Sequence, residues 1–141
     1  MENKITVCVA DADQAYRTEL CDFLKKQGDI CLIGDTADGR EALAMVEAQH
    51  PAVLVLDDSS SALDYRTDAR LRQALREQYK DTTTIIIAQR ISSIKHCDHI
   101  LVLDDGKEIG YGTHQELLES CEVYRQISQS QMGGVDIAAR T

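Results

Sequence analysis

The sequence predicts one α/β domain built on a mainly parallel sheet. Short apolar runs rich in Val, Ile and Leu alternate with stretches that repeat apolar residues at helical spacing. No linker rich in Pro, Gly or Ser interrupts this alternation, and the 141 residues suffice for one hydrophobic core. Because the runs lack polar alternation, we expect strands covered by helices on both faces and joined by right-handed crossovers.

Five apolar runs predict the parallel strands, at residues 5–11, 30–35, 52–58, 82–88 and 99–105. After the fifth run, Asp105-Gly106 is typical of a tight hairpin turn. We therefore expect "KEIGYG" (107–112) to fold back as an antiparallel sixth strand at the edge.

Capping residues and apolar spacing predict the helices between these strands. Asp13 opens the first helix, and Asp38-Gly39 opens the second, which ends near Pro51. A third helix over about 65–79 turns Leu71 and Leu75 inward, and a short one follows near 91–95. The capping box at 113–116 opens a final helix that breaks near Ser120 and resumes over 122–130. The single domain is expected to span 1–131, as fragments 1–57 and 58–131, before a flexible tail at 132–141.

Composition and charge narrow the possible partners. The net charge of −9 argues against nucleic acid and anionic membranes, both of which need a basic face. No apolar run approaches the roughly 20 residues of a membrane span, and the polar start "MENK" is unlike a signal peptide. Five cysteines without a C-x-x-C pair predict reduced core residues of a cytoplasmic protein. We expect a monomer without a known partner, with a domain-swapped dimer as the alternative.

Residues from about 1 to 57 resemble the receiver domain of bacterial response regulators, of the sporulation-initiation type. The stretches that carry this resemblance are "KITVCVADAD", "IGDTADGREALAMV" and "HPAVLVLD". It implies that acids after the first strand hold Mg²⁺ and that the Asp ending the third strand accepts a phosphoryl group. Asp11 matches one such acid and Asp57 the phosphoacceptor, whereas Ala12 replaces a second carboxylate.

Residues from about 53 to 131 resemble the C-terminal half of an ABC exporter nucleotide-binding domain. "VLVLDDSSSALD" looks like its Walker B strand and D-loop, and "TTTIIIAQRISSIKHCDHILVLDDGKEIGYGTHQELLES" continues the match. The resemblance implies that Asp57 is the Mg²⁺-side Walker B acid. Asp58 replaces the catalytic Glu and Gln89 the switch His. These replacements look like a degenerate site, which binds ATP but hydrolyses it poorly.

Each resemblance lacks parts that its chemistry requires. The sequence has no G-x-x-x-x-G-K-[ST] run to hold phosphates, no LSGGQ-type signature and no aromatic residue that would stack on adenine. Strand four ends in Ala88-Gln89 instead of a hydroxyl, and strand five in Asp104-Asp105 instead of a Lys. We therefore expect no ATP binding and no enzymatic activity.

The resulting interpretation is an engineered chimera of two fragments that acts as a folded scaffold. One alternative is a receiver-like signalling domain phosphorylated on Asp57. A second is an interaction module derived from an ABC protein, docking through "SSSALD".

Acidic residues cluster at the predicted strand ends, where α/β proteins usually bind ligands. They are Asp11, Asp13, Asp57, Asp58, Asp104 and Asp105. Either they form a solvated acidic rim, or Asp11, Asp57 and Asp58 bind Mg²⁺ or Ca²⁺ weakly through oxygen ligands. No other cofactor is expected.

The two resemblances imply different strand orders. Receiver domains have the flavodoxin-like order 2-1-3-4-5, whereas in the exporter domain a Walker A strand separates the strands that correspond here to four and five. An unfilled gap would leave backbone groups unpaired, at about 1–3 kcal/mol for each buried group. We therefore predict the doubly wound order 2-1-3-4-5, with strand five paired to strand four. The alternative is a gap filled by a strand from a second chain.

Overall fold

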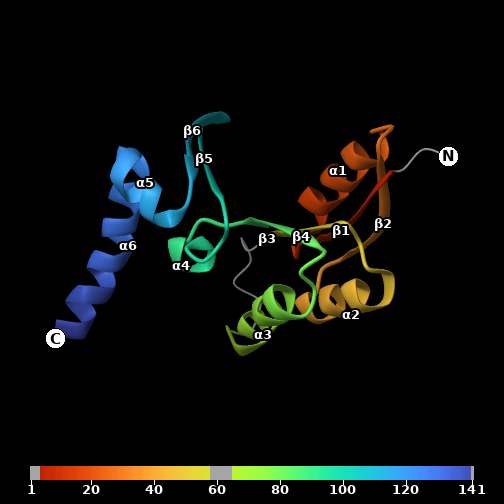
Figure 1. Ribbon diagram of the computed structural model, residues 1–141, viewed down its shortest axis with the longest axis horizontal. Helices are drawn as coiled ribbons and strands as arrows, with labels where there is room; N and C mark the ends of the chain where they lie inside the picture. Colours follow the sequence, from red (N-terminus) through yellow and green to blue (C-terminus); the bar gives the residue numbers. More distant parts are fainter. Residues whose placement is uncertain (1–3, 58–64, 141) are drawn as a thin grey trace. The chain divides into compact units, whose positions relative to one another are not determined.

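The computed structural model describes residues 4–57 and 65–140. The chain divides into two compact units, residues 1–87 and 88–141, which are drawn in Figure 1 and described separately below. The expected single domain over 1–131 and the flexible tail at 132–141 stay predictions.

The first unit is a four-stranded parallel sheet with the order β2-β1-β3-β4. Its elements are β1 (Ile5–Ala10), α1 (Gln14–Lys25), β2 (Ile30–Thr36), α2 (Gly39–Gln49), β3 (Val53–Asp57), α3 (Tyr65–Glu77) and β4 (Thr83–Ile87). The predicted α/β class and the flavodoxin-like order of these strands are confirmed.

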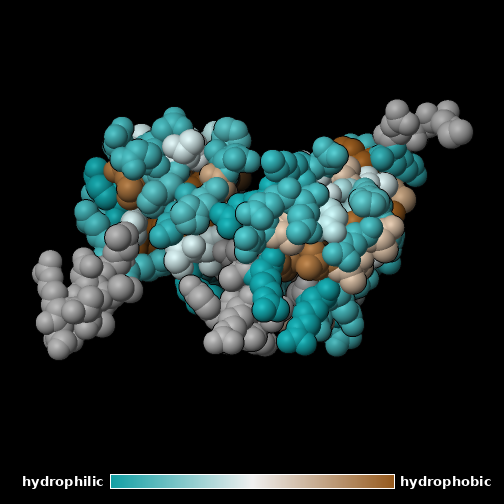
Figure 2. All heavy atoms as spheres, turned by 60° about the horizontal axis from the view of Figure 1, so that its bottom comes forward, coloured by the Kyte–Doolittle hydropathy of each residue, from teal (hydrophilic) through white to brown (hydrophobic). Residues whose placement is uncertain are grey.

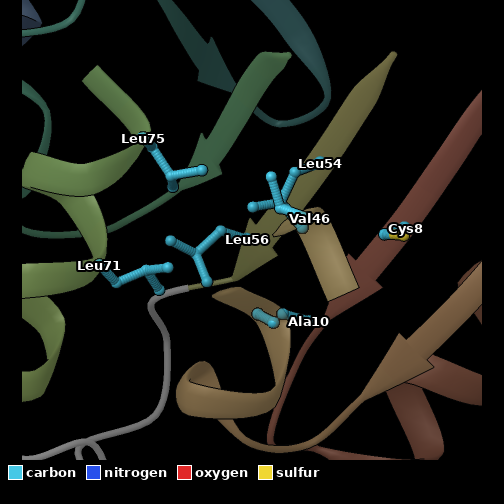
Figure 3. Packing of buried hydrophobic residues seen from close by; sticks show 8 residues of the cluster. Cys8, Ala10, Val46, Leu54, Leu56, Leu71 and Leu75 are labelled. Atoms are coloured by element: carbon cyan, nitrogen blue, oxygen red, sulfur yellow. The ribbon is translucent and has the colours of Figure 1, made fainter. Parts of the chain in front are cut away.

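Helices cover both faces of this sheet, as the uninterrupted apolar strands require. Figure 1 shows α1 on one face and α2 with α3 on the other. Figure 3 shows Leu71 and Leu75 of α3 pointing toward Leu54 and Leu56 of β3. These four leucines are buried together with Cys8, Ala10, Ala42 and Val46. The inward orientation predicted for Leu71 and Leu75 is therefore confirmed.

Local signals set the ends of α1 and α2. The carboxylate of Asp13 accepts a hydrogen bond from the N–H of Tyr16 at 3.1 Å, and that of Asp38 accepts one from Arg40 at 2.8 Å. Both N-caps occupy the predicted positions. Helix α2 ends at His50, whose left-handed backbone (φ 46°) stops the helix immediately before Pro51.

The second unit contains a two-stranded antiparallel sheet, β5 (Ile100–Asp104) with β6 (Lys107–Gly112). Its helices are α4 (Ile91–Ile94), α5 (His114–Ser120) and α6 (Glu122–Arg140). Asp105 and Gly106 have φ angles of 52° and 75°, which confirms the predicted hairpin turn. Thr113 and Glu116 form the predicted capping box. The core of this unit contains Ile91, Ile100, Val102, Leu117, Cys121 and Tyr124.

The position of strand five differs from the prediction. Among the described residues, the parallel sheet ends at β4, and β5 pairs with β6 in a sheet of its own. The hairpin closes across a two-residue turn, so its pairing requires little loop-closure entropy. Helix α6 also continues past Ser130, to Arg140.

On the face shown in Figure 2, hydrophilic residues cover most of each unit, with smaller hydrophobic areas between them. Within the described parts of the chain, no helix combines the length and apolar character of a membrane span.

Replacing Leu54 by Ala should destabilise the protein by about 2–5 kcal/mol, because the side chain is fully buried between β3 and its covering helices. Urea unfolding followed by circular dichroism measures the change. Leu103→Ala removes the same atoms from a side chain that is 59% exposed, and it should change the unfolding free energy by less than about 0.5 kcal/mol. Equal losses in the two variants would contradict the assigned core.

Candidate functional site

Two carboxylates meet at the carboxyl edge of the parallel sheet. Asp57 is the last residue of β3, and Asp11 directly follows β1. The register pairs Ala10 with Leu56, so the next residues of the two strands lie side by side. The exposed fraction is 2% for Asp11 and 8% for Asp57. Sequence analysis placed both residues at one sheet edge, and the structure brings them together.

Hydrogen bonds hold Asp11 firmly in this position. Its N–H donates to the carbonyl of Thr36 at 2.9 Å, and its own carbonyl accepts from Nη1 of Arg17 at 2.5 Å. One carboxylate oxygen, Oδ1, accepts from the N–H of Asp13 at 2.9 Å. The second oxygen, Oδ2, is buried without a hydrogen-bond partner in the part of the chain that the structure describes.

The surroundings of Asp11 favour its neutral form. Burial is the main cause that raises the pKa of Asp11 above its ordinary value. The hydrogen bond from the N–H of Asp13 lowers this pKa, whereas the nearby negative charge of Asp57 raises it. A proton on Asp11 would remove the repulsion between the two acids.

A divalent cation would satisfy the same oxygen. Mg²⁺ and Ca²⁺ prefer carboxylate oxygens, and a cation between two acids removes their repulsion. The donor set of Asp11 and Asp57 therefore fits a hard cation with further ligands from water or phosphate. No cluster of three or more His, Cys, Asp or Glu suited to a metal occurs among the described residues. The third predicted ligand, Asp58, lies outside them.

The remaining predicted residues lie either outside the described residues or in the second unit. The stretch 58–64, with "SSSALD", lies outside the described residues. Gln89 is exposed, and its carbonyl accepts a hydrogen bond from Nε2 of Gln131 at 2.9 Å. Asp104 ends β5 and Asp105 lies in the β5–β6 turn, so neither residue ends a strand of the parallel sheet. The expectation that these two acids end a strand of the parallel sheet is therefore wrong.

Sequence analysis missed two residues that support the site. Arg17 of α1 binds the Asp11 carbonyl and forms a 3.1 Å ion pair with Asp35. Thr36 is buried at the end of β2, and its hydroxyl donates to Glu41 at 2.5 Å. The spacing of Arg17 from the cap Asp13, one helical turn, is a signal that could have placed it near the strand end.

Comparisons with known proteins agree with both resemblances. No protein-family model matches the chain. An uncharacterized ABC transporter ATP-binding protein of Mycobacterium bovis is 38% identical over 132 residues, which are 90% of this chain and 22% of that protein. An ATP-dependent lipid A-core flippase of Idiomarina loihiensis is 37% identical over 130 residues, or 87% of this chain and 22% of the flippase. The chain thus spans about a fifth of the length of these relatives.

Two solved structures resemble this chain. The signal receiver domain of the putative response regulator NarL from Mycobacterium tuberculosis has a TM-score of 0.53 and 27% identity, and the match covers 62% of this chain and 68% of that domain. A bacterial Atm1-family ABC exporter with ATP bound has a TM-score of 0.57 and 31% identity, over 85% of this chain and 23% of the exporter. The chain resembles both families.

These relatives correct several expectations. The interpretation as an engineered scaffold without native activity is wrong, because the similar proteins include natural ABC transporter ATP-binding proteins. The expectations of no enzymatic activity, no ATP and no membrane partner are contradicted by the same relatives and by the ATP-bound exporter. The assignment of Asp57 as a phosphoacceptor stays a prediction.

Replacing Asp11 by Asn should stabilise the protein at neutral pH by about 1 kcal/mol or more, because a buried, repelled carboxylate is removed. The pKa of Asp11 is higher in the folded protein than in the unfolded chain. The wild type therefore loses stability as the pH rises from the pKa in the unfolded chain, about 3.9, through the pKa in the folded protein. The gain should therefore vanish below about pH 3.5. Urea unfolding in EDTA across pH 3–8 measures it.

Asp29→Asn is the control for this charge change, because Asp29 is exposed at the opposite end of the sheet. It should change stability by less than about 0.5 kcal/mol. A gain for Asp11→Asn that persists unchanged at pH 3 would contradict the proposed cause.

Proposed function

We propose that this chain is part of an ABC-type ATP-hydrolysing unit that serves a membrane transporter. The observation that carries the proposal is the buried pair of Asp11 and Asp57 at the carboxyl edge of the sheet, with Oδ2 of Asp11 left unsatisfied. The similarity to ABC transporter ATP-binding proteins over 90% of the chain supports it.

In this proposal Asp57 is the Mg²⁺ ligand, and Asp11 offers a second oxygen beside it. The parallel pairing with β1 on one side and β4 on the other fixes Asp57 at the strand end. A rigid carboxylate needs no reorganisation when the charge of the phosphates develops. When bound, Mg²⁺ would neutralise part of that charge.

The residue replacements predict slow hydrolysis. Asp58 stands where the ABC resemblance places the catalytic Glu, and its side chain is one methylene shorter. Gln89 replaces the switch His, and an amide cannot take up a proton at neutral pH. We therefore assign the chain mainly to Mg²⁺·ATP binding, with weak turnover.

The phosphates of ATP need a phosphate-binding run that donates hydrogen bonds, and this sequence lacks one. No G-x-x-x-x-G-K-[ST] run occurs in it, and two carboxylates alone repel phosphate. We propose that a polypeptide carrying this run completes the site, with Mg²⁺ between its bound phosphates and Asp57. Transporter ATP sites of this kind would place the chain on the cytoplasmic side, where its five free cysteines stay reduced.

Mg²⁺ should raise the melting temperature beyond the effect of NaCl at matched ionic strength, because a ligand bound only by the folded state stabilises it. At a Mg²⁺ concentration of 100 times Kd, the gain is about 2.7 kcal/mol. Asp57→Asn should remove this increment, and Asp29→Asn should keep it. Differential scanning calorimetry measures all three, and an unchanged increment in Asp57→Asn would exclude Asp57 as the ligand.

ATP hydrolysis should appear when the chain is mixed with an ABC-domain fragment that carries the G-x-x-x-x-G-K-[ST] run. Phosphate release by the mixture should exceed the sum of the separate samples, and Asp57→Asn should lower it by about 100-fold or to background. Asp29→Asn serves as the matched control and should retain the rate. A mixture no more active than its parts would overturn the proposed function.

A further inference from the structure

In the second unit, the side chain of Gln131 in α6 bridges the backbone of a segment that is distant in the sequence. Its Oε1 accepts a hydrogen bond from the N–H of Ile91 at 2.9 Å, and its Nε2 donates to the carbonyl of Gln89 at 2.9 Å. These partners are 40 and 42 positions away from Gln131 in the chain. The two bonds therefore hold the segment 89–91 against α6.

The amide of Gln131 matches this segment because it offers one donor and one acceptor side by side. Arg90, between the two bonded residues, has an extended backbone with φ −100° and ψ 128°. In an extended segment, the carbonyl of one residue and the N–H two positions later face the same side. The Gln131 side chain thus pairs with Gln89 and Ile91 as a residue of a neighbouring parallel strand would.

Helix α4 takes its N-terminal cap from this side chain. Arg90 is the N-cap residue of α4, and its side chain forms no capping hydrogen bond. A guanidinium has no acceptor, so Arg90 cannot bind an N–H at the start of the helix. Gln131 supplies the acceptor from α6, because it binds the N–H of Ile91, the first residue of α4.

The part of α6 that carries Gln131 is anchored in the core of the second unit. Tyr124 and Ser128 of this helix are buried. Gln131 continues their i, i+4, i+7 spacing, so the three side chains share one face of α6. The hydroxyl of Tyr124 also lies 2.7 Å from Nδ1 of His114 in α5. Helix α6 therefore presents the Gln131 amide from a rigid support.

The segment that Gln131 holds contains a residue of the ABC resemblance. Gln89 is exposed and stands where that resemblance places the switch His. Its amide cannot take up a proton at neutral pH, but it can donate a hydrogen bond to a phosphate oxygen. Such a donor contributes to the rate only where its backbone is fixed, because a displaced group loses most of its effect.

We propose that Gln131 is a positioning residue, which holds the segment 89–91 so that Gln89 can donate a hydrogen bond to a phosphate of ATP. This inference rests on the proposed function, because it requires ATP at the completed site. Gln131 acts through the backbone groups of Gln89 and Ile91 and not on the substrate itself. Helix α6 then contributes to turnover through a single side chain.

Amide hydrogen exchange of the full chain, followed by NMR, tests the contact. Gln131→Ala removes the acceptor, so the N–H of Ile91 should exchange at least about tenfold faster than in the wild type. Gln129→Ala is the matched control, because Gln129 is an exposed residue of the same helix, and it should leave the exchange of Ile91 unchanged. Unchanged protection of Ile91 in Gln131→Ala would overturn the proposal.

A double-mutant cycle in the mixture with the ABC-domain fragment tests the role in turnover. Gln131→Ala and Gln89→Ala should each lower kcat about tenfold, and Gln129→Ala should retain it. In a chain that already carries Gln89→Ala, Gln131→Ala should change kcat by less than about twofold, because the group that it positions is absent. An equal loss in both backgrounds would overturn the inference and leave the proposed function intact. A wild-type mixture without activity would instead overturn the proposed function and this role of Gln89 together.

Discussion

The parallel pairing of β1 with β3 is the constraint on which the rest of the structure depends. Strand β3 lies between β1, from the receiver-like part, and β4, from the exporter-like part. Its buried leucines, Leu54 and Leu56, hold α2 and α3 against the same face. The pairing also sets Asp11 beside Asp57, since both residues end their strands at one edge. A stretch that two families share can therefore join them without a break in the sheet, because each family uses an apolar strand that ends in Asp.

The same constraint creates an unfavourable contact between two acids in the first unit. Two acids at adjacent strand ends are held in place by the sheet, so they cannot separate to relieve their repulsion. The hydrogen bonds from Asp13 and Arg17 position Asp11 but leave its Oδ2 unsatisfied in the described structure. A fold retains such strain where a ligand compensates for it, and this is the physical reason to look for function at this edge rather than in the core.

Local sequence signals predicted the elements well, and pairing between distant elements less well. The caps at Asp13, Asp38 and Thr113 and the turn at Asp105-Gly106 were predictable, because each depends on residues a few positions apart. The neighbour of strand five was not, since "ILVLD" is equally apolar whichever strand it pairs with. For the site, the predicted ends of two parallel strands were enough to predict that Asp11 and Asp57 lie at the same sheet edge. The functional interpretation was wrong because it treated the absence of a phosphate-binding run as the absence of ATP chemistry, although a second polypeptide can supply that run.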